Sequence, residues 1–140
     1  MVLAEILIET ENLKKKIKQL MVYMNSVSSR NSEITDQANT KLLSLLDKHR
    51  SYLILINEIN NKTEVSVGGA TLSLANAIII TQTTKKKIDI LNMLIDNENC
   101  VLDVIAIIDN RDKLLEEYTA IYKEIKYQEW RIEIDKEGVG

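Results

Sequence analysis

The feature that most constrains this chain is an aliphatic seam that recurs at alternating steps of three and four residues. In the first segment the seam consists of Leu3, Ile6, Thr10, Leu13, Ile17, Leu20, Met24 and Val27. The same spacing returns in three later segments, and the chain contains no proline, which would force a break in a helix. A seam of this period predicts long amphipathic helices in a bundle or coiled coil.

The later seams place the remaining helices. The second consists of Ala38, Leu42, Leu45, His49, Tyr52, Ile56 and Ile59. The third consists of Leu74, Ala77, Thr81, Thr84, Ile88, Leu91 and Ile95. The fourth consists of Leu114, Tyr118, Ile121, Ile125, Gln128 and Ile132. We therefore expect helices over about 1–27, 36–61, 73–97 and 110–135.

Polar residues at the expected helix starts can accept hydrogen bonds from unpaired backbone N–H groups. The candidate capping residues are Thr35 or Asp36 for the second helix, Thr71 or Ser73 for the third, and Asp109 or Asn110 for the last. The two threonines in the middle of the third seam allow two interpretations. They permit either a close approach between helices or a polar lining for a cavity.

A small β element is expected between the second and third helices. Gly68 and Gly69 separate two short β-prone runs, and a two-residue glycine link favours a hairpin because its turn needs positive φ. Residues 101–108 are mostly β-branched and apolar, so we expect them to pair with residues 63–72, although their propensity also allows a helix. The fold class expected is mainly α, a four-helix antiparallel bundle or coiled coil with a small β-hairpin.

Length and composition narrow the class of protein. The 140 residues predict one domain, residues 1–140, and the formal charge of −3 argues against nucleic-acid binding. The single cysteine, Cys100, permits no disulfide within the chain and favours a reducing compartment, so we expect a cytoplasmic protein. Glu5, Glu9 and Glu11 interrupt the apolar run that a signal peptide would need, so we expect no signal peptide. Long aliphatic seams with few aromatics leave stripes that a second copy could cover, which predicts a homo-oligomer.

Residues 65–84 carry no charge over 20 positions, the length of a membrane span. Eight of these residues are Ser, Thr, Asn or Gln and two are glycine, so a buried turn followed by a helix start is the favoured interpretation. This composition argues against a membrane partner.

No enzyme motif is found. The chain lacks a Gly-x-Ser-x-Gly nucleophile motif, and Gly68-Gly69 lacks the Gly-Lys-Ser/Thr ending of a phosphate loop. The only histidine, His49, falls on the second seam, where we expect it to pair with a neighbouring side chain rather than to bind a metal. We therefore expect a protein that is not an enzyme, with no catalytic residues, no metal site and no cofactor.

Four stretches together resemble a known family. They are Leu3 to Glu9, Ile56 to Thr63, Gly69 to Ala77 and Lys126 to Trp130. In this order they resemble a family of small helical bacterial and phage-borne proteins labelled septicolysin-like, whose name suggests a lytic toxin. Arginines that the family carries in its third helix are replaced here by Ile79, Ile80 and nearby threonine and glutamine, so the resemblance implies no anion contact at those positions.

A binding function is the remaining expectation. The start of the third helix offers N–H groups and a partial positive charge to an anion, and cations and aromatics could gather around it. The candidate ligand-binding residues are Lys62, Gly68, Gly69, Thr71, Ser73, Lys85, Arg111, Tyr118, Tyr122 and Trp130. The alternative is that the glycines serve only the turn and the aromatics only the core.

Three functions stay open at this point. The first is a non-enzymatic oligomeric protein that captures a small anionic or nucleotide-like ligand. The second is a structural coiled-coil adaptor between proteins, and the third is a membrane-active lytic protein that uses residues 65–84.

Overall fold

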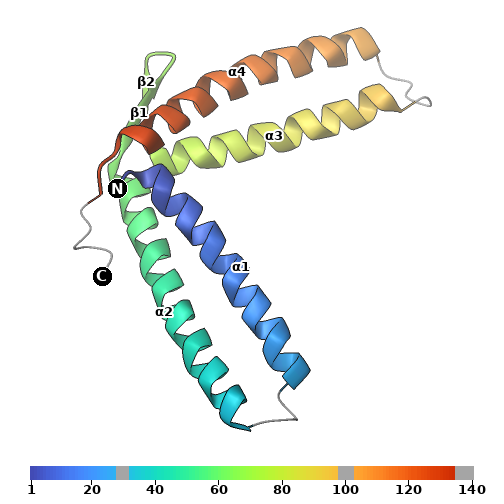
Figure 1. The fold of residues 1–140 in the computed structure, drawn as a ribbon. Coiled ribbons are helices and arrows are strands. Elements are labelled where there is room, and N and C mark those ends of the chain that lie inside the picture. The colour runs from blue at the N-terminus through green and yellow to red at the C-terminus, as the bar shows by residue number, and fades with distance from the viewer. Residues whose placement is uncertain (28–31, 98–102, 135–140) are drawn as a thin grey trace. The chain divides into compact units, whose positions relative to one another are not determined.

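The computed structural model describes residues 1–27, 32–97 and 103–134. Its elements in chain order are α1 (Leu3–Val27), α2 (Ser32–Lys62), β1 (Glu64–Val67), β2 (Ala70–Ser73), α3 (Leu74–Asp96) and α4 (Val104–Arg131) (Figure 1). This confirms the expected class, mainly α with a small β-hairpin. The chain divides into two compact units, one formed by Met1–Ile59 with Trp130–Gly140 and the other by Asn60–Glu129. The expected single-domain organisation stays a prediction.

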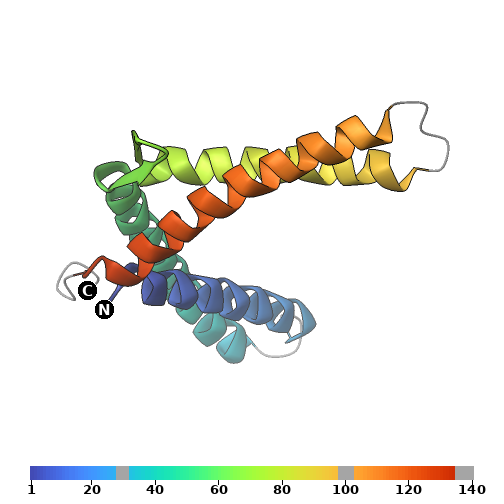
Figure 2. The same cartoon turned by 90° about the horizontal axis from the view of Figure 1, so that it is seen from above.

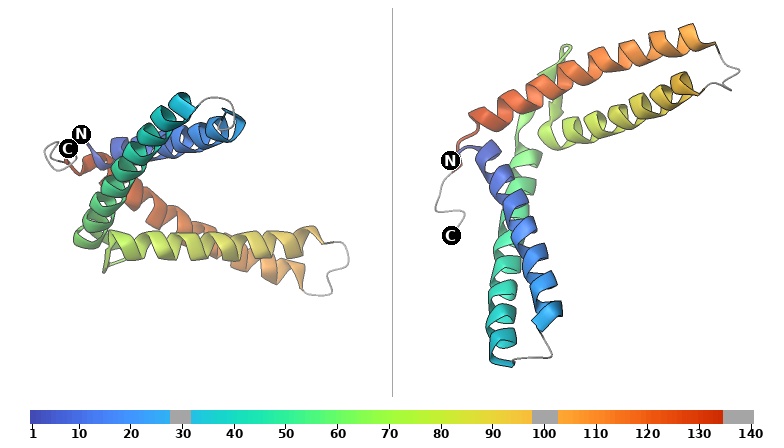
Figure 3. Two further views of the ribbon diagram at one scale, coloured as in Figure 1. Left: turned by 90° about the horizontal axis from the view of Figure 1, so that it is seen from below. Right: turned by 45° about the vertical axis from the view of Figure 1, so that its right-hand side comes forward.

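The first unit contains a pair of antiparallel helices, α1 and α2, which lie side by side in every view (Figures 1 and 3). Its core cluster is Leu13, Ile17 and Tyr52, with Leu42 and Leu45 packed against it. These residues belong to the predicted first and second seams, so the three-and-four spacing is confirmed as the contact face of both helices.

The N-terminal residues of the first unit pair with the segment that follows α4. Val2 and Glu133 form an antiparallel bridge, in which the Leu3 N–H donates to Ile132 O at 3.1 Å and the Ile134 N–H donates to Met1 O at 2.7 Å. This bridge was not expected from the sequence. The last helix was predicted to run to about 135, whereas α4 ends at Arg131 because the next residues are extended and hydrogen-bonded in this bridge.

In the second unit, which begins at Asn60, the β-hairpin lies directly before α3 (Figure 2). Its register pairs Val65 with Leu72 and Val67 with Ala70, which leaves Gly68 and Gly69 as a two-residue turn. Both glycines have positive φ, +58° and +82°, as a primed turn requires. The predicted hairpin and its turn are therefore confirmed.

Residues 101–108 do not provide the partner strand that the sequence suggested. From Val104 onward they are helical, and 101–102 lie outside the described residues. The Asp103 carboxylate accepts hydrogen bonds from the N–H groups of Ile105 and Ala106, at 3.1 and 3.2 Å, so it caps α4. The predicted caps Asp109 and Asn110 are wrong, since both lie inside this helix.

Helix starts were predicted with mixed success. Ser73 caps α3 as expected, because its hydroxyl accepts from the Asn76 N–H at 3.1 Å. The second helix begins at Ser32, four residues before the predicted start, so Thr35 and Asp36 lie within α2 and do not cap it.

The third seam is buried as predicted, at Leu74, Ala77, Thr81, Thr84 and Ile88. The Thr81 hydroxyl donates to the Ala77 carbonyl of its own helix at 2.8 Å, which favours close packing over a cavity lining. Residues 65–84, taken as one uncharged stretch in the sequence, are divided between the hairpin and the first half of α3. Among the described residues, no helix has the length and apolar character needed to cross a membrane.

Candidate functional site

The glycine turn and the start of α3 use most of their polar groups internally. The Ser73 hydroxyl is occupied by the Asn76 N–H, and the Leu74 N–H donates to Thr63 O at 2.7 Å. Two N–H groups that an anion would need at this helix start therefore already have acceptors. Gly68, Gly69 and Thr71 are exposed in the hairpin.

The predicted residues of α4 fall in two separate places. Arg111 donates from Nη1 to Asn92 Oδ1 at 3.2 Å, which links α4 to α3, and its guanidinium also contacts the Asp112 carboxylate. Tyr118 and Tyr122 stack with ring centroids 5.6 Å apart and planes 17° apart. Arg111 and Tyr122 are eleven residues apart, about 16 Å along a helix axis, so they do not share one small pocket.

Tyr122 belongs instead to a short cluster with its neighbours on α4. Lys126 Nζ lies 5.3 Å from the centre of the Tyr122 ring and forms a salt bridge of 3.0 Å with the buried Glu129. The hydrogen bond to Glu129 raises the pKa of Lys126, although desolvation opposes it. These contacts all join residues of α4. Of the predicted site residues, they bring together only Tyr118 and Tyr122.

The other predicted residues are dispersed. Lys62 and Lys85 are exposed on α2 and α3, and Trp130, with 59% of its surface exposed, falls in the first unit. None of the hollows that we describe below, all formed by described residues, is lined by any of the ten predicted residues.

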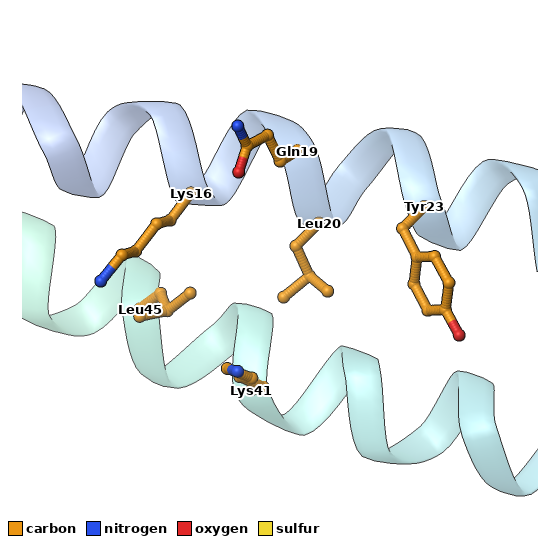
Figure 4. A pocket seen from close by; sticks show the side chains of 6 residues that line it. All are labelled: Lys16, Gln19, Leu20, Tyr23, Lys41 and Leu45. Carbon is orange, nitrogen blue, oxygen red and sulfur yellow. The ribbon is translucent and has the colours of Figure 1, made fainter.

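A better candidate lies in the first unit, between α1 and α2. A hollow of about 420 Å³ is lined by Lys16, Gln19, Leu20, Tyr23, Lys41 and Leu45 (Figure 4). In this view the Leu20 and Tyr23 side chains extend from α1 toward α2, and Leu45 lies on α2 close to the Lys16 side chain. The hollow is thus apolar along its base and carries ammonium groups from both helices.

A second hollow continues along the same helix pair. It has a volume of about 290 Å³, and its lining residues are Glu9, Asn12, Leu13, Lys16, Lys48 and Tyr52. Because Lys16 lines both hollows, we treat them as one feature, the α1–α2 groove. Three lysines and one carboxylate line this groove, so its lining carries a net positive charge although the net charge of the whole chain is −3.

That single carboxylate is already engaged. The Tyr52 hydroxyl donates to Glu9 Oε2 at 3.0 Å, and Lys48 Nζ lies 5.6 Å from the centre of the Tyr52 ring. Burial raises the pKa of the Tyr52 phenol, and the hydrogen bond and negative charge of Glu9 raise it further, while Lys48 opposes them. Glu9 therefore offsets part of the positive charge at one end of the groove, and Lys16 and Lys41 remain at the other.

His49 shares a face of α2 with Leu45 and Tyr52, as its place in the seam predicts. Its Nε2 atom is buried and has no hydrogen-bond partner among the described residues. The expectation that His49 pairs with a neighbouring side chain is therefore wrong for this nitrogen.

One hollow is also present between α3 and α4 in the second unit. Its volume is about 490 Å³, and it is lined by Lys87, Ile90, Leu91, Asn110, Lys113, Leu114 and Glu117. Two lysines and a glutamate surround an aliphatic base there, without an aromatic ring. Within the described parts of the chain, no group of three or more His, Cys, Asp and Glu side chains could hold a metal ion.

The residues that line the α1–α2 groove are not among the ligand-binding residues predicted from the sequence. Lys16 lies in a lysine-rich run with Lys14, Lys15 and Lys18, whose side chains point in different directions around a helix, and Lys41 and Lys48 are seven residues apart. The available signal was that each of these lysines is next to a seam residue, since Ile17, Leu42 and His49 follow them directly.

No family model, curated protein or solved structure matches the chain. The fold and the groove define its class, a mainly α protein with helical hairpins and a basic, tyrosine-containing groove.

Proposed function

We propose that this protein is a non-enzymatic binding protein that holds a small anionic ligand in the α1–α2 groove. The observation that carries the proposal is that Lys16 and Lys41, from opposite helices, line the same hollow as Tyr23. The ligand class agrees with the small anionic or nucleotide-like ligand expected from the sequence, but the site moves from the start of α3 to the first unit.

The lining suits a phosphate group attached to a flat ring. Lysine ammonium groups bind phosphate as point charges, and a tyrosine ring can stack on a base in a manner that tolerates different bases. Tyr23 is 45% exposed, so its ring is accessible for such stacking. Leu20 and Leu45 supply the apolar base of the hollow.

The expected affinity is modest. An exposed charge pair contributes roughly 0.2–1 kcal/mol, and a stacked base contributes about 1–3 kcal/mol. Together these terms favour a dissociation constant nearer millimolar than nanomolar for one chain. The affinity should fall as salt is added, because exposed charges are screened over about 10 Å at 0.1 M ionic strength.

The groove chemistry also favours binding over catalysis. A tyrosine that acts as a general base needs a pKa near the working pH. Here burial and Glu9 raise the pKa of Tyr52, so the phenol stays protonated at neutral pH. Its hydroxyl donates a hydrogen bond to Glu9, so Tyr52 serves as a structural contact between α1 and α2.

Isothermal titration with adenosine triphosphate, a cyclic dinucleotide and inorganic pyrophosphate tests the proposal. We expect the nucleotides to bind, and the double variant Lys16→Gln with Lys41→Gln to weaken that binding by about tenfold. The matched control is Lys85→Gln with Lys86→Gln on α3, which should leave the affinity unchanged. Absence of binding by all three probes at millimolar concentration would overturn the proposal, as would equal losses in both double variants.

Binding of pyrophosphate, which has no base, separates the contribution of the lysines to the affinity from that of stacking on Tyr23. If it binds as tightly as adenosine triphosphate, the lysines act alone and Tyr23 does not stack on a base. A Tyr23→Leu variant should then have no effect, whereas in the nucleotide proposal it weakens adenosine triphosphate binding and leaves pyrophosphate binding unchanged.

A structural adaptor is the second candidate function, because large apolar side chains remain exposed on the helices. They include Ile8, Leu43, Leu46, Leu53, Ile54, Ile79, Ile90, Met93, Ile105 and Leu115. Exposed apolar stripes of this kind mark surfaces that associate with protein. A stoichiometric complex with a purified partner, lost when an exposed stripe is made polar, would support this candidate.

A further inference from the structure

The face of α2 that does not pack against α1 carries exposed apolar side chains on both sides of a central pair of charged residues. Leu43, Leu46, Leu53 and Ile54 are 55%, 41%, 47% and 53% exposed. At 100° per residue these four side chains lie within roughly 100° of arc, which forms one face of the helix. This face is distinct from the seam that packs against α1, which runs through Leu42, Leu45 and Tyr52.

Two opposite charges occupy the centre of the same face. Asp47 and Arg50 lie between the apolar ends, and their side chains are 76% and 74% exposed. Arg50 Nη2 and Asp47 Oδ1 are 3.8 Å apart, a weak contact between residues one turn apart on an exposed helix. We define the outward face as Leu43, Leu46, Asp47, Arg50, Leu53 and Ile54.

Four of these residues, Leu43, Asp47, Arg50 and Ile54, are self-complementary when the helix is reversed, while Leu46 and Leu53 then meet Ser51 and Ser44. A twofold axis placed between Lys48 and His49 exchanges position 47 with 50 and position 43 with 54. Each aspartate then meets an arginine, and each terminal leucine meets an isoleucine. Such exchange is the property of an isologous interface, in which residue i contacts j and j contacts i.

We propose that the outward face packs against the same face of a second copy of this chain, with the two α2 helices antiparallel. In this pairing Asp47 lies beside Arg50 of the partner subunit, and Leu43 lies beside Ile54 of the partner subunit. A parallel pairing would place like charges against each other at both central positions, so the charge pattern selects the antiparallel arrangement.

The pairing is independent of the ligand proposal. Lys41, Leu45 and Lys48 line the α1–α2 groove from the other side of α2. A second copy on the outward face therefore leaves the groove open, and either proposal can fail without the other.

Sedimentation velocity of the full chain over the micromolar range tests the pairing. We expect a reversible dimer, and we expect Asp47→Arg or Arg50→Asp alone to raise its dissociation constant at least about tenfold, because each places like charges together. The double variant Asp47→Arg with Arg50→Asp should restore dimerisation. Circular dichroism of every variant checks that these exposed changes leave the helices folded.

Mixing the two single variants decides the direction of packing. In the antiparallel arrangement the mixture forms a heterodimer about as tight as the wild-type dimer. A mixture tighter than the wild type would indicate parallel packing and overturn the proposal. A monomeric wild type, or a dimer that ignores both single charge reversals, would overturn it equally.

Discussion

Replacing Tyr52 by phenylalanine removes a single hydrogen bond between side chains of α1 and α2, the bond from Tyr52 to Glu9. The variant keeps the buried ring, which is 4% exposed, and removes only the hydroxyl that donates to Glu9 at 3.0 Å. A hydrogen bond to a charged group contributes about 1.5–3 kcal/mol. Glu9 is half-buried and can regain water, so we expect a loss near the lower end, about 1.5 kcal/mol.

The dependence on pH gives the sharper measurement. Because the folded pKa of Tyr52 lies above its ordinary value of 10.0, the folded state favours the neutral phenol. The stability that this shift contributes is fully present below pH 10 and is lost as the pH rises through the folded pKa. At higher pH a tyrosinate would face the Glu9 carboxylate, so the advantage of the wild type over Tyr52→Phe should shrink.

Urea unfolding of both proteins by circular dichroism, at neutral pH and at steps up to about pH 11, measures this difference. Tyr23→Phe is the control, since Tyr23 is 45% exposed and its change should cost less than about 0.5 kcal/mol. A Tyr52→Phe loss that stays constant across the pH series would refute the coupling to Glu9. A neutral-pH loss no larger than that of the control would refute the hydrogen bond itself.

Three further pairs of substitutions test the fold. Leu13→Ala should lower the free energy of unfolding by about 3 kcal/mol, because it leaves a cavity in the core cluster. Ile8→Ala, at a site that is 54% exposed, should lower it by less than about 1 kcal/mol. Equal losses in the two variants would contradict the assigned core. Gly69→Ala should lower the free energy of unfolding by about 1 kcal/mol because the φ of Gly69 is +82°, although no atom lies within 4 Å of an added Cβ. Gly69→Asn should lower it by less, and thermal unfolding of both variants measures the difference. Ser73→Ala should cost about 1 kcal/mol in urea unfolding while Ser73→Asp keeps the cap, and equal losses would remove the capping role.

The sequence was sufficient for the helix faces. Burial at Leu13 and Ile17 of α1 and at Ala77 and Ile88 of α3 follows from the three-and-four spacing alone, because that spacing places each seam on one side of a helix. The hairpin was predictable for a similar reason, since two consecutive glycines suit a turn that needs positive φ twice.

Helix starts were less predictable, because several residues near each start have side chains that can cap. Asp103 caps α4, although Asp109 has the same chemistry six residues later. The residues between them are β-branched and resemble a strand in composition. Their burial decides the matter: Ile107 is buried while Val104 and Ile105 are exposed, as in a helix that buries one side.

The candidate site was not predictable from the sequence, because it depends on the register between two helices. The bond from Tyr52 to Glu9 fixes which turns of α1 and α2 face each other. In that register Lys16 lies near Leu45, and Leu20 lies near Lys41 (Figure 4). A shift of one turn, about 5.4 Å, would separate these groups while keeping both seams buried. Seam periodicity cannot distinguish the two registers.

The proposed ligand site and the proposed dimer surface use different faces of α2, so a substitution on one face should affect ligand binding or dimerisation but not both. Lys41 and Lys48 lie beside the seam that meets α1, whereas Asp47 and Arg50 lie at the centre of the outward face. Substituting the groove lysines should therefore weaken ligand binding without changing the dimer, and reversing Asp47 should dissociate the dimer without changing the affinity per chain. If reversing Asp47 also weakened ligand binding, the ligand site would need both copies, and the groove of a single chain would be only part of it.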